Sequence, residues 1–252
     1  MSPLETYYDA HATDNPFMDH RLQVVADLVR DLAPQSVLDI GCGRGTLLKA
    51  LRQQEPNRRY IGSELSAHLR SQAQQAGFFV VKSDIEKGLD LPDESVDCVV
   101  FGEVIEHLVD PDAALQHISR VLRKDGYLIV TTPNLASWCN RILLLMGIQP
   151  LFTETSLHAK LGRKLRALGQ WNATEGHLKI FTLAALCEML RSNGFLVHNT
   201  FGTRFPGSPP FGFLDAFFAR FTTLASGLIV VATNGRTLAT RYGGHALPTA
   251  KE

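Results

Sequence analysis

The segment VLDIGCGRGTLL, residues 37–48, decides how this 252-residue chain folds. A short apolar run that suits a buried strand leads into a turn with glycine at every second position, and a helical pattern follows. Because glycine has no Cβ and accepts positive φ, a ligand can lie directly against the backbone of this turn. Asp39 ends the strand, where its carboxylate can accept hydrogen bonds from loop amides or from a cationic ligand group. The segment therefore predicts a strand–loop–helix ligand site.

The spacing of these glycines separates two kinds of cofactor. A dinucleotide fingerprint, G-x-G-x-x-G, requires glycine at position 46, where this chain has Thr46. The pattern present, acidic-x-G-x-G-x-G, resembles the first motif of the class I S-adenosylmethionine (SAM) methyltransferases. That resemblance implies SAM as the cofactor, with Asp39 beside it. It also implies that four loop residues line the cofactor site: Gly41, Cys42, Gly43 and Gly45.

Two acidic residues further along the chain fit the same family. RYIGSE, residues 59–64, reads as a strand that ends at Glu64, whose carboxylate can accept both ribose hydroxyls of SAM or of NAD. The next strand, residues 78–81, is followed by Asp84. The resemblance implies that Asp84 accepts from the adenine amino group while the following backbone amide meets the ring. It therefore adds Leu65 and Ile85 to the cofactor-binding residues.

The segment GEVIEHL, residues 102–108, follows a fourth predicted strand and strengthens the resemblance. A dehydrogenase does not account for its glutamates and histidine. In the methyltransferase interpretation, the Gly102 carbonyl takes the amino group of SAM and Glu103 lines the methionine end. A fifth strand at residues 127–134 completes the series, so the resemblance covers roughly residues 36 to 134.

The order of the elements predicts the fold class. Strands alternate with helices, which favours an α/β, Rossmann-like, doubly wound and mostly parallel sheet with its crevice at the carboxyl ends of the strands. The resemblance implies seven strands, the last of them antiparallel and beside the fifth. The predicted helices cover residues 22–32, 46–54, 66–76, 112–122 and 182–192, with Ser66 and Asp112 as N-caps, and the last strand covers residues 227–232.

We expect one SAM-binding domain over residues 1–235. Residues 1–33 form an N-terminal lid and helix, and residues 236–252 read as a flexible polar tail. An interruption at residues 135–177 is expected to be a helical lid that recognises the substrate. In the N-terminal lid, Tyr8 or Arg21 is placed to meet the cofactor carboxylate, although a tyrosine near a terminus also packs on surfaces.

Two histidines are candidates for catalysis. Methyl transfer needs a base only when the acceptor is a hydroxyl or a protonated amine. His107 follows the fourth strand by one turn, but it also suits a structural position beside the cofactor loop. His177 lies in the interruption, where the acceptor is expected. Along the chain, no cluster of His, Cys and Asp has metal-ligand spacing, so no metal is expected.

Bulk composition points to a cytoplasmic enzyme. Lysine and arginine number 25 and so do aspartate and glutamate, which argues against a nucleic-acid footprint. The four cysteines are isolated, without the spacing of a zinc site or of a disulfide framework. The N-terminus has no basic region followed by an apolar core, so no signal peptide is expected. Nothing in the sequence indicates an oligomeric state.

The apolar segment at residues 205–232 has three interpretations. It is a core helix plus the last strand, a hydrophobic wall for a lipid-like acceptor, or a face that rests on a membrane surface. Asp215 and Arg220 argue against a transmembrane helix. The resulting hypothesis is a SAM-dependent methyltransferase that acts on a small or lipid-like metabolite, at oxygen. The alternative is a SAM-binding regulatory or partner protein without its own turnover.

Overall fold

A seven-stranded sheet forms the centre of the protein. The computed structural model describes residues 18–156, 158–159, 161–162, 174–205 and 211–235. The strands are β1 (Ser36–Ile40), β2 (Arg59–Ser63), β3 (Phe79–Val81), β4 (Val96–Gly102), β5 (Leu122–Pro133), β6 (Phe195–Thr203) and β7 (Gly227–Asn234). Their order is β3-β2-β1-β4-β5-β7-β6, with β7 antiparallel to both neighbours and β1 to β5 paired in parallel. The predicted α/β, Rossmann-like sheet with an antiparallel last strand beside the fifth is confirmed.

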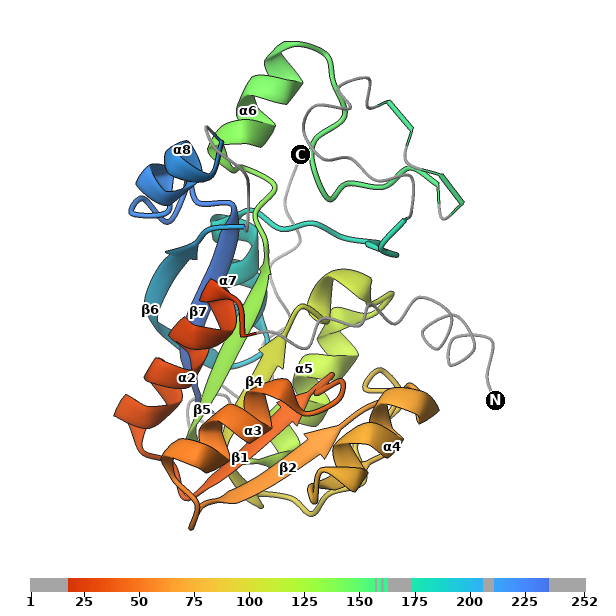
Figure 1. Ribbon diagram of the computed structural model, residues 1–252, viewed down its shortest axis with the longest axis vertical. Helices are drawn as coiled ribbons and strands as arrows, with labels where there is room; N and C mark the ends of the chain where they lie inside the picture. The colour runs from red at the N-terminus through yellow and green to blue at the C-terminus, as the bar shows by residue number, and fades with distance from the viewer. Residues whose placement is uncertain (1–17, 157, 160, 163–173, 206–210, 236–252) are drawn as a thin grey trace, which may run out of the picture.

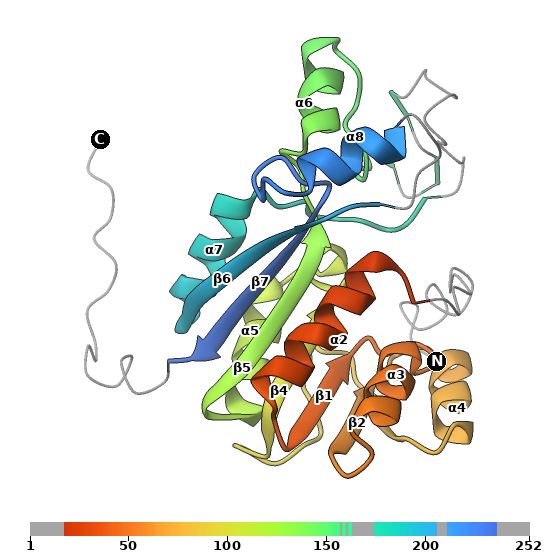
Figure 2. The same ribbon diagram turned by 60° about the vertical axis from the view of Figure 1, so that its left-hand side comes forward.

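Helices cover both faces of this sheet, as Figures 1 and 2 show. One face carries α2 (His20–Leu32), α3 (Thr46–Gln54) and α4 (Ala67–Gln75), and the other carries α5 (Pro111–Val121) and α7 (Leu183–Ser192). Successive side chains of a strand point to opposite faces. Val37 therefore packs in one hydrophobic core and its neighbour Leu38 in the other. Burial on both faces explains why the central strands read as continuous apolar runs.

Two helix starts were predicted from their capping residues. Ser66 caps α4 as predicted, since its Oγ accepts from the Leu69 amide at 3.2 Å. The predicted cap Asp112 is wrong, because α5 is capped by Asp110, whose Oδ1 accepts from the Ala113 amide at 3.0 Å. Pro111 fixes the start of this helix: its φ suits the first helical position and its missing N–H leaves no donor unsatisfied there.

The segments around the last strands emerge at the carboxyl edge of the parallel strands. Pro133 at the end of β5 pairs with Gly227 at the start of β7. The helix after β5, α6 (Trp138–Leu145), and the helix before β7, α8 (Phe211–Phe218), therefore lie beyond the same edge (Figures 1 and 2). Within the described part of the predicted insertion, α6 is helical. Among the described residues, no helix has the length and apolar character needed to cross a membrane.

Only part of the apolar segment 205–232 belongs to the core. Strand β7 is almost entirely buried, as the core interpretation requires. Helix α8 is not a core helix: Phe213 is 79% exposed, and the one buried residue of the helix is Asp215. The core interpretation is therefore wrong for α8, because this helix turns its carboxylate inward and its aromatic rings outward.

Candidate active site

The glycine loop connects β1 to α3 at the carboxyl edge of the sheet. Gly41, Gly43 and Gly45 have φ values of 73°, 55° and 80°, a region that residues with a Cβ rarely adopt. A Cβ on Gly41 would come within 2.5 Å of Val104 Cγ2, so the loop packs closely against the segment after β4. A Cβ on Gly43 would meet no atom of the described residues within 4 Å. That side of the loop is an open cradle that a side chain would fill.

Glu64 joins the end of β2 to this loop. Its carboxylate is buried, Oε2 accepts from the Gly43 amide at 2.8 Å, and Oε1 accepts from the Ser66 amide at 2.8 Å. Burial raises the pKa of Glu64, while the amides of Ser66 and Gly43 act in the opposite direction. Each carboxylate oxygen has a second acceptor position, so the group can still bind ligand hydroxyls. The half-buried Leu65 follows directly.

Asp39 lies beneath the same loop and is 6% exposed. Burial raises its pKa to about 7, the charge of Glu64 adds to that shift, and the guanidinium of Arg21 opposes it. A cationic ligand group beside Asp39 would favour the ionised carboxylate. The neighbouring thiol of Cys42 is buried and its pKa is raised well above the usual value, so it lines the site as a small, neutral group.

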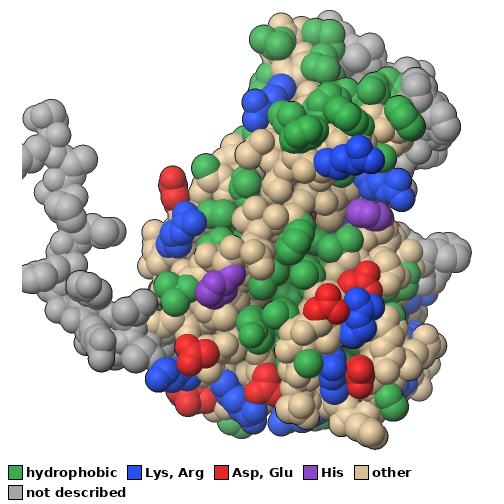
Figure 3. Space-filling view, turned by 90° about the vertical axis from the view of Figure 1, so that its left-hand side faces the viewer, with side chains coloured by type: hydrophobic (Ala, Val, Ile, Leu, Met, Phe, Trp, Pro, Cys, Tyr) green, Lys and Arg blue, Asp and Glu red, His purple; other side chains and the backbone are tan. Residues whose placement is uncertain are grey.

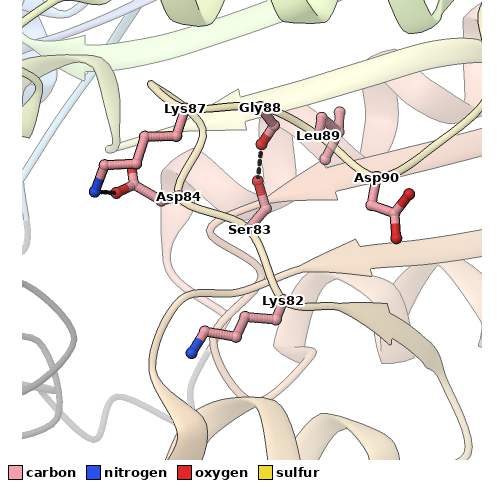
Figure 4. Close-up of a pocket in the computed structure, with 7 residues that line it drawn as sticks. All are labelled: Lys82, Ser83, Asp84, Lys87, Gly88, Leu89 and Asp90. Atoms are coloured by element: carbon pink, nitrogen blue, oxygen red, sulfur yellow. Dashed lines mark hydrogen bonds and ion pairs between the residues drawn. The ribbon is translucent and has the colours of Figure 1, made fainter. Parts of the chain in front are cut away.

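Asp84 and Ile85 follow β3, at the same edge of the sheet. Lys87 Nζ lies 2.6 Å from Asp84 Oδ2, and the side chain of Ile85 is buried. An open hollow of about 370 Å³ lies here. Figure 4 shows its lining residues, with Ser83 Oγ donating to the Gly88 carbonyl. All residues that line this hollow belong to the segment 82–90. The hollow therefore belongs to this one loop, and it includes neither the glycine loop nor Glu64.

Arg21 reaches the carboxyl edge from α2. Its Nη1 donates to Thr131 Oγ1 at 3.3 Å, and its Nε lies 3.8 Å from Glu103 Oε1. Thr131 Oγ1 in turn donates to Glu103 Oε1 at 2.9 Å. Glu103 follows Gly102 with a φ of 54°, so the chain turns sharply where β4 ends. Thr131 was missed from the sequence because a threonine in a buried strand has no motif around it.

Glu106 is a fully buried carboxylate just after β4, in the 3-10 turn η1 (Ile105–His107). Its Oε2 accepts from Thr132 Oγ1 at 3.1 Å. Among the described residues, its buried Oε1 has no hydrogen-bond partner. Burial, with the charge of Glu103 next, raises the pKa of Glu106 well above the usual value. Its main-chain oxygen accepts from the amides of Leu178 and Lys179, which attaches the insertion to η1.

His107 and His177 lie in contact across the boundary between the core and the insertion. Their ring centroids are 4.8 Å apart, although 70 positions separate them in the sequence. Nδ1 of His107 lies 3.2 Å from the Gly176 carbonyl, and Nδ1 of His177 lies 3.0 Å from the Phe152 carbonyl. Because a carbonyl only accepts, both Nδ1 atoms carry the hydrogen. Burial, and then the charge of His177, lowers the pKa of His107 to about 4.

Polar side chains that the sequence did not reveal hold the insertion in place. Glu154 accepts from three successive amides: Oε1 from that of Glu175 at 2.7 Å, and Oε2 from those of Gly176 at 2.8 Å and His177 at 3.2 Å. The buried Asn140 accepts from the Leu151 amide at 2.7 Å. These bonds fix the backbone that carries His177. No sequence motif marks them, because the partners come from separate loops.

Comparisons with known proteins agree with this geometry. A family model described as a methyltransferase domain matches residues 14–200. The chain is 31% identical over 199 residues to a probable S-adenosylmethionine-dependent methyltransferase of Mycolicibacterium smegmatis, covering 76% of this chain and 63% of that one. The chain belongs to the class I SAM-dependent methyltransferases. The prediction of this enzyme class, with SAM as its cofactor, is thereby confirmed.

Two further comparisons extend this result to a curated relative and to a solved structure. A ubiquinone biosynthesis O-methyltransferase of Aeromonas salmonicida is 26% identical over 190 residues, covering 73% of each chain. A crystal structure from Thermotoga maritima, described as a SAM-dependent methyltransferase and possible histamine N-methyltransferase, is 21% identical with a TM-score of 0.54. It covers 92% of this chain and 94% of that chain. This methyltransferase spans only 39% of the length of some other curated relatives.

The methyltransferase fold brings the predicted site residues to one edge. The glycine loop, Glu64, Asp39 and Arg21 lie within one electrostatic network, and Glu103 joins it through Thr131. Tyr8 lies outside the described residues. Contact of each of these residues with SAM stays a prediction, as do the catalytic roles of His107 and His177.

Proposed function

We propose that this methyltransferase transfers a methyl group from SAM to an oxygen of a small or lipid-like acceptor. The contact between His107 and His177 carries the proposal, because it brings the insertion over the edge that holds the cofactor residues. When bound, SAM supplies an electrophilic methyl group on its sulfonium. The chain then needs to hold the acceptor in line with that group and to exclude water.

The residues present fit SAM chemically. Gly43 leaves an open cradle for a ligand to lie on the loop, and Glu64 offers a buried carboxylate for the ribose hydroxyls. Asp39 and the Gly102 carbonyl can accept from an amino group, and Arg21 offers a cation for a carboxylate. The acidic and basic groups thus match both charged ends of the amino-acid part of SAM.

His177 is the stronger candidate for the general base. The lowered pKa of His107, about 4, makes that ring a weak proton acceptor at neutral pH. His177 is carried by the insertion, its Nδ1 is held by the Phe152 carbonyl, and its Nε2 lies 3.6 Å from Glu175 Oε2. This arrangement holds the imidazole in the tautomer that can take a proton at Nε2.

An aromatic wall next to His177 supports an apolar acceptor. The rings of Phe152 and Phe205 stack with centroids 4.5 Å apart, and the centroid of Phe152 lies 6.0 Å from that of His177. Rings in this arrangement suit a phenolic or polyprenyl-like group. The name of the Aeromonas relative, a ubiquinone biosynthesis O-methyltransferase, also favours oxygen as the acceptor atom.

The proposal includes contact with a membrane surface through the α6–α8 surface. This surface consists of exposed large apolar side chains on and after the two helices, gathered around α6 and α8 in Figure 3. Its members are Ile142, Leu144, Leu145, Met146, Phe211, Phe213, Leu214, Phe217 and Phe221. Leu145 is 88% exposed and Phe213 is 79% exposed. An apolar surface of this kind marks an interaction site.

The buried Asp215 explains why α8 presents its rings to the outside. Its carboxylate accepts from Trp138 Nε1 at 2.9 Å, from the Phe205 amide at 2.8 Å and from Ser226 Oγ. The ring of Trp138 stacks on Phe218 at 5.2 Å, which joins α6 to α8. The polar side of α8 is thus fixed against the protein, and the aromatic side is left for an apolar partner.

The charges near this surface favour an anionic lipid bilayer as that partner. In the sequence, residues 135–153 and 201–227 contain three arginines and one acidic residue, the buried Asp215. The arginines are exposed: Arg141, Arg204 and Arg220. Basic groups around an apolar face add electrostatic attraction to anionic headgroups. A lipid-like acceptor would then enter the site from the membrane.

Transfer of a labelled methyl group tests the proposal. The protein is incubated with SAM and three kinds of acceptor: a polyprenyl phenol, a phospholipid and a sugar. We expect label in the polyprenyl phenol as a methyl ether. Binding of S-adenosylhomocysteine with no transfer to any hydroxyl would instead support the alternative, a SAM-binding protein without its own turnover.

A further inference from the structure

Among the described residues, the carboxylate of Glu106 has a buried oxygen without a hydrogen-bond partner. The residue is fully buried, Oε2 accepts from Thr132, and Oε1 has no hydrogen-bond partner among the described residues. A buried oxygen without a partner loses its hydration without compensation. The fold nevertheless places this carboxylate beside two imidazoles, so a ligand that joins all three groups would satisfy it.

Both imidazoles have the hydrogen bonds that metal ligands have. In metal sites, a ligating histidine usually donates its other ring N–H to a backbone carbonyl or carboxylate. His107 has Nδ1 at the Gly176 carbonyl, and His177 has Nδ1 at the Phe152 carbonyl. In the neutral rings, Nε2 is then the atom with the lone pair. Two separate loops thus orient two rings in the same way.

We propose that Glu106, His107 and His177 bind a divalent transition-metal ion. One donor atom from each residue lies within 4.8 Å of the others. With metal–ligand bonds of about 2.1 Å, donors on one ion lie at most about 4.2 Å apart, so binding draws the three groups slightly together. Two imidazoles and one carboxylate suit Zn²⁺ or Mn²⁺ better than Mg²⁺. This site replaces the expectation of no metal, which considered spacing along the chain only.

Three protein ligands leave positions on the ion for an acceptor oxygen. A divalent cation lowers the pKa of a hydroxyl that binds to it. The hydroxyl proton then passes to solvent, and the C–O bond forms as the bond from the methyl carbon to sulfur breaks. This role rests on the proposed function, whereas binding of the ion does not. In this role His177 acts as a ligand of the metal ion and not as a general base.

Direct binding of Mn²⁺ to the metal-free protein tests the site. The protein is treated with a chelator and titrated with Mn²⁺, and free Mn²⁺ is measured by electron paramagnetic resonance, with Zn²⁺ and Mg²⁺ as competitors. We expect one Mn²⁺ per chain, displaced by Zn²⁺ far more readily than by Mg²⁺. His177→Ala and Glu106→Gln should each weaken binding at least about tenfold. The control is His198→Ala, because His198 is an exposed histidine that contacts Thr233 on β7.

The outcomes separate this inference from the proposed function. The proposed metal site is overturned if the wild-type protein binds neither Mn²⁺ nor Zn²⁺. It is also overturned if both variants bind the ion as tightly as the wild type does. Binding of S-adenosylhomocysteine, measured in parallel, shows whether each variant is folded. If Glu106→Gln does not fold, the result with His177→Ala alone decides the test. Metal binding without methyl transfer to any acceptor would leave the site standing and contradict the proposed function. If the protein binds no metal and a chelator leaves methyl transfer unchanged, the proposed function stands and the metal site is contradicted.

Discussion

At the scale of single residues, Asp39 links the cofactor site to stability. Its pKa is raised from 3.8 to about 7 in the folded protein. The charged and titratable groups that face it are Arg21, Glu64 and Cys42. A carboxyl whose pKa is higher in the folded state prefers to be neutral there. The folded protein therefore binds this proton more tightly than the unfolded chain does.

We predict that Asp39 makes the cofactor-free protein less stable as the pH rises from about 4 to about 7. The loss belongs to this window because only there is the group ionised in the unfolded chain and protonated in the fold. It amounts to at most about 4 kcal/mol, from roughly three pKa units. Urea unfolding of the wild type and of Asp39→Asn across this window measures it. Equal pH dependence in both proteins would contradict the prediction.

Gly43 offers a second test at this scale. We expect Gly43→Val to lower affinity for S-adenosylhomocysteine at least about a hundredfold, because the side chain fills the open cradle and strains a positive φ. Calorimetric titration measures the affinity. Gly194→Val is the matched control, since Gly194 also has a positive φ, 83°, and no atom from the described part of the chain lies within 4 Å of its Cβ position. Equal affinity loss in both variants would point to general destabilisation.

His177 is tested by separating turnover from cofactor binding. We predict that His177→Ala slows methyl transfer about a hundredfold or more, as a base or a metal ligand would. Its affinity for S-adenosylhomocysteine should stay close to the wild-type value, because the ring contacts His107 and Phe152, outside the cradle. Steady-state kinetics and calorimetry provide the two values. Unchanged turnover would remove His177 from the mechanism.

At the scale of elements, the exposed sides of α6 and α8 are apolar and form the α6–α8 surface. We predict that Leu145→Ser and Phe213→Ser each reduce binding to lipid vesicles about tenfold relative to the wild type, because each removes an apolar side chain from the lipid contact. Flotation with vesicles of phosphatidylglycerol and phosphatidylcholine in equal amounts measures binding. Vesicles of phosphatidylcholine alone should bind the protein more weakly, since the arginines then lose their anionic partners.

Phe79→Ser is the matched control for these two variants, because Phe79 is 62% exposed but lies on the opposite edge strand, β3. Its vesicle binding should equal that of the wild type. Wild-type protein that fails to float with the anionic vesicles would contradict the membrane contact. Self-association that both α6–α8 variants abolish would assign the surface to a second copy of the chain.

The elements also show what could be predicted from the sequence. The strands from β1 to β5 were predictable because the central ones, buried on both faces, are apolar runs, and because a polar motif residue such as Asp39 or Glu64 lies at or next to a strand end. The start of β5 was not, since this strand begins at Leu122, before the predicted residue 127. The orientation of α8 was not, because it depends on the donors that Trp138, Phe205 and Ser226 bring to Asp215. An apolar run with one carboxylate is equally compatible with a core helix.

At the scale of the whole molecule, the site combines a predictable half and an unpredictable half. The cofactor half follows one βαβα succession, so local motifs locate it. The proposed acceptor half joins η1, the insertion and the segment near Phe205, which are far apart in the sequence. Contacts such as His107 with His177, or Glu154 with three successive amides, arise only when those segments fold together. Spacing along the chain contains no signal for them.

The central claim is that the cofactor half and the acceptor half act together in methyl transfer to a lipid-like hydroxyl. The most direct measurement follows tritiated methyl groups from SAM into a polyprenyl phenol, extracted into organic solvent. We predict labelled methyl ether with the wild type, almost none with Gly43→Val, and a strongly reduced amount with His177→Ala. A wild-type protein that binds S-adenosylhomocysteine but leaves the phenol unlabelled would contradict the claim.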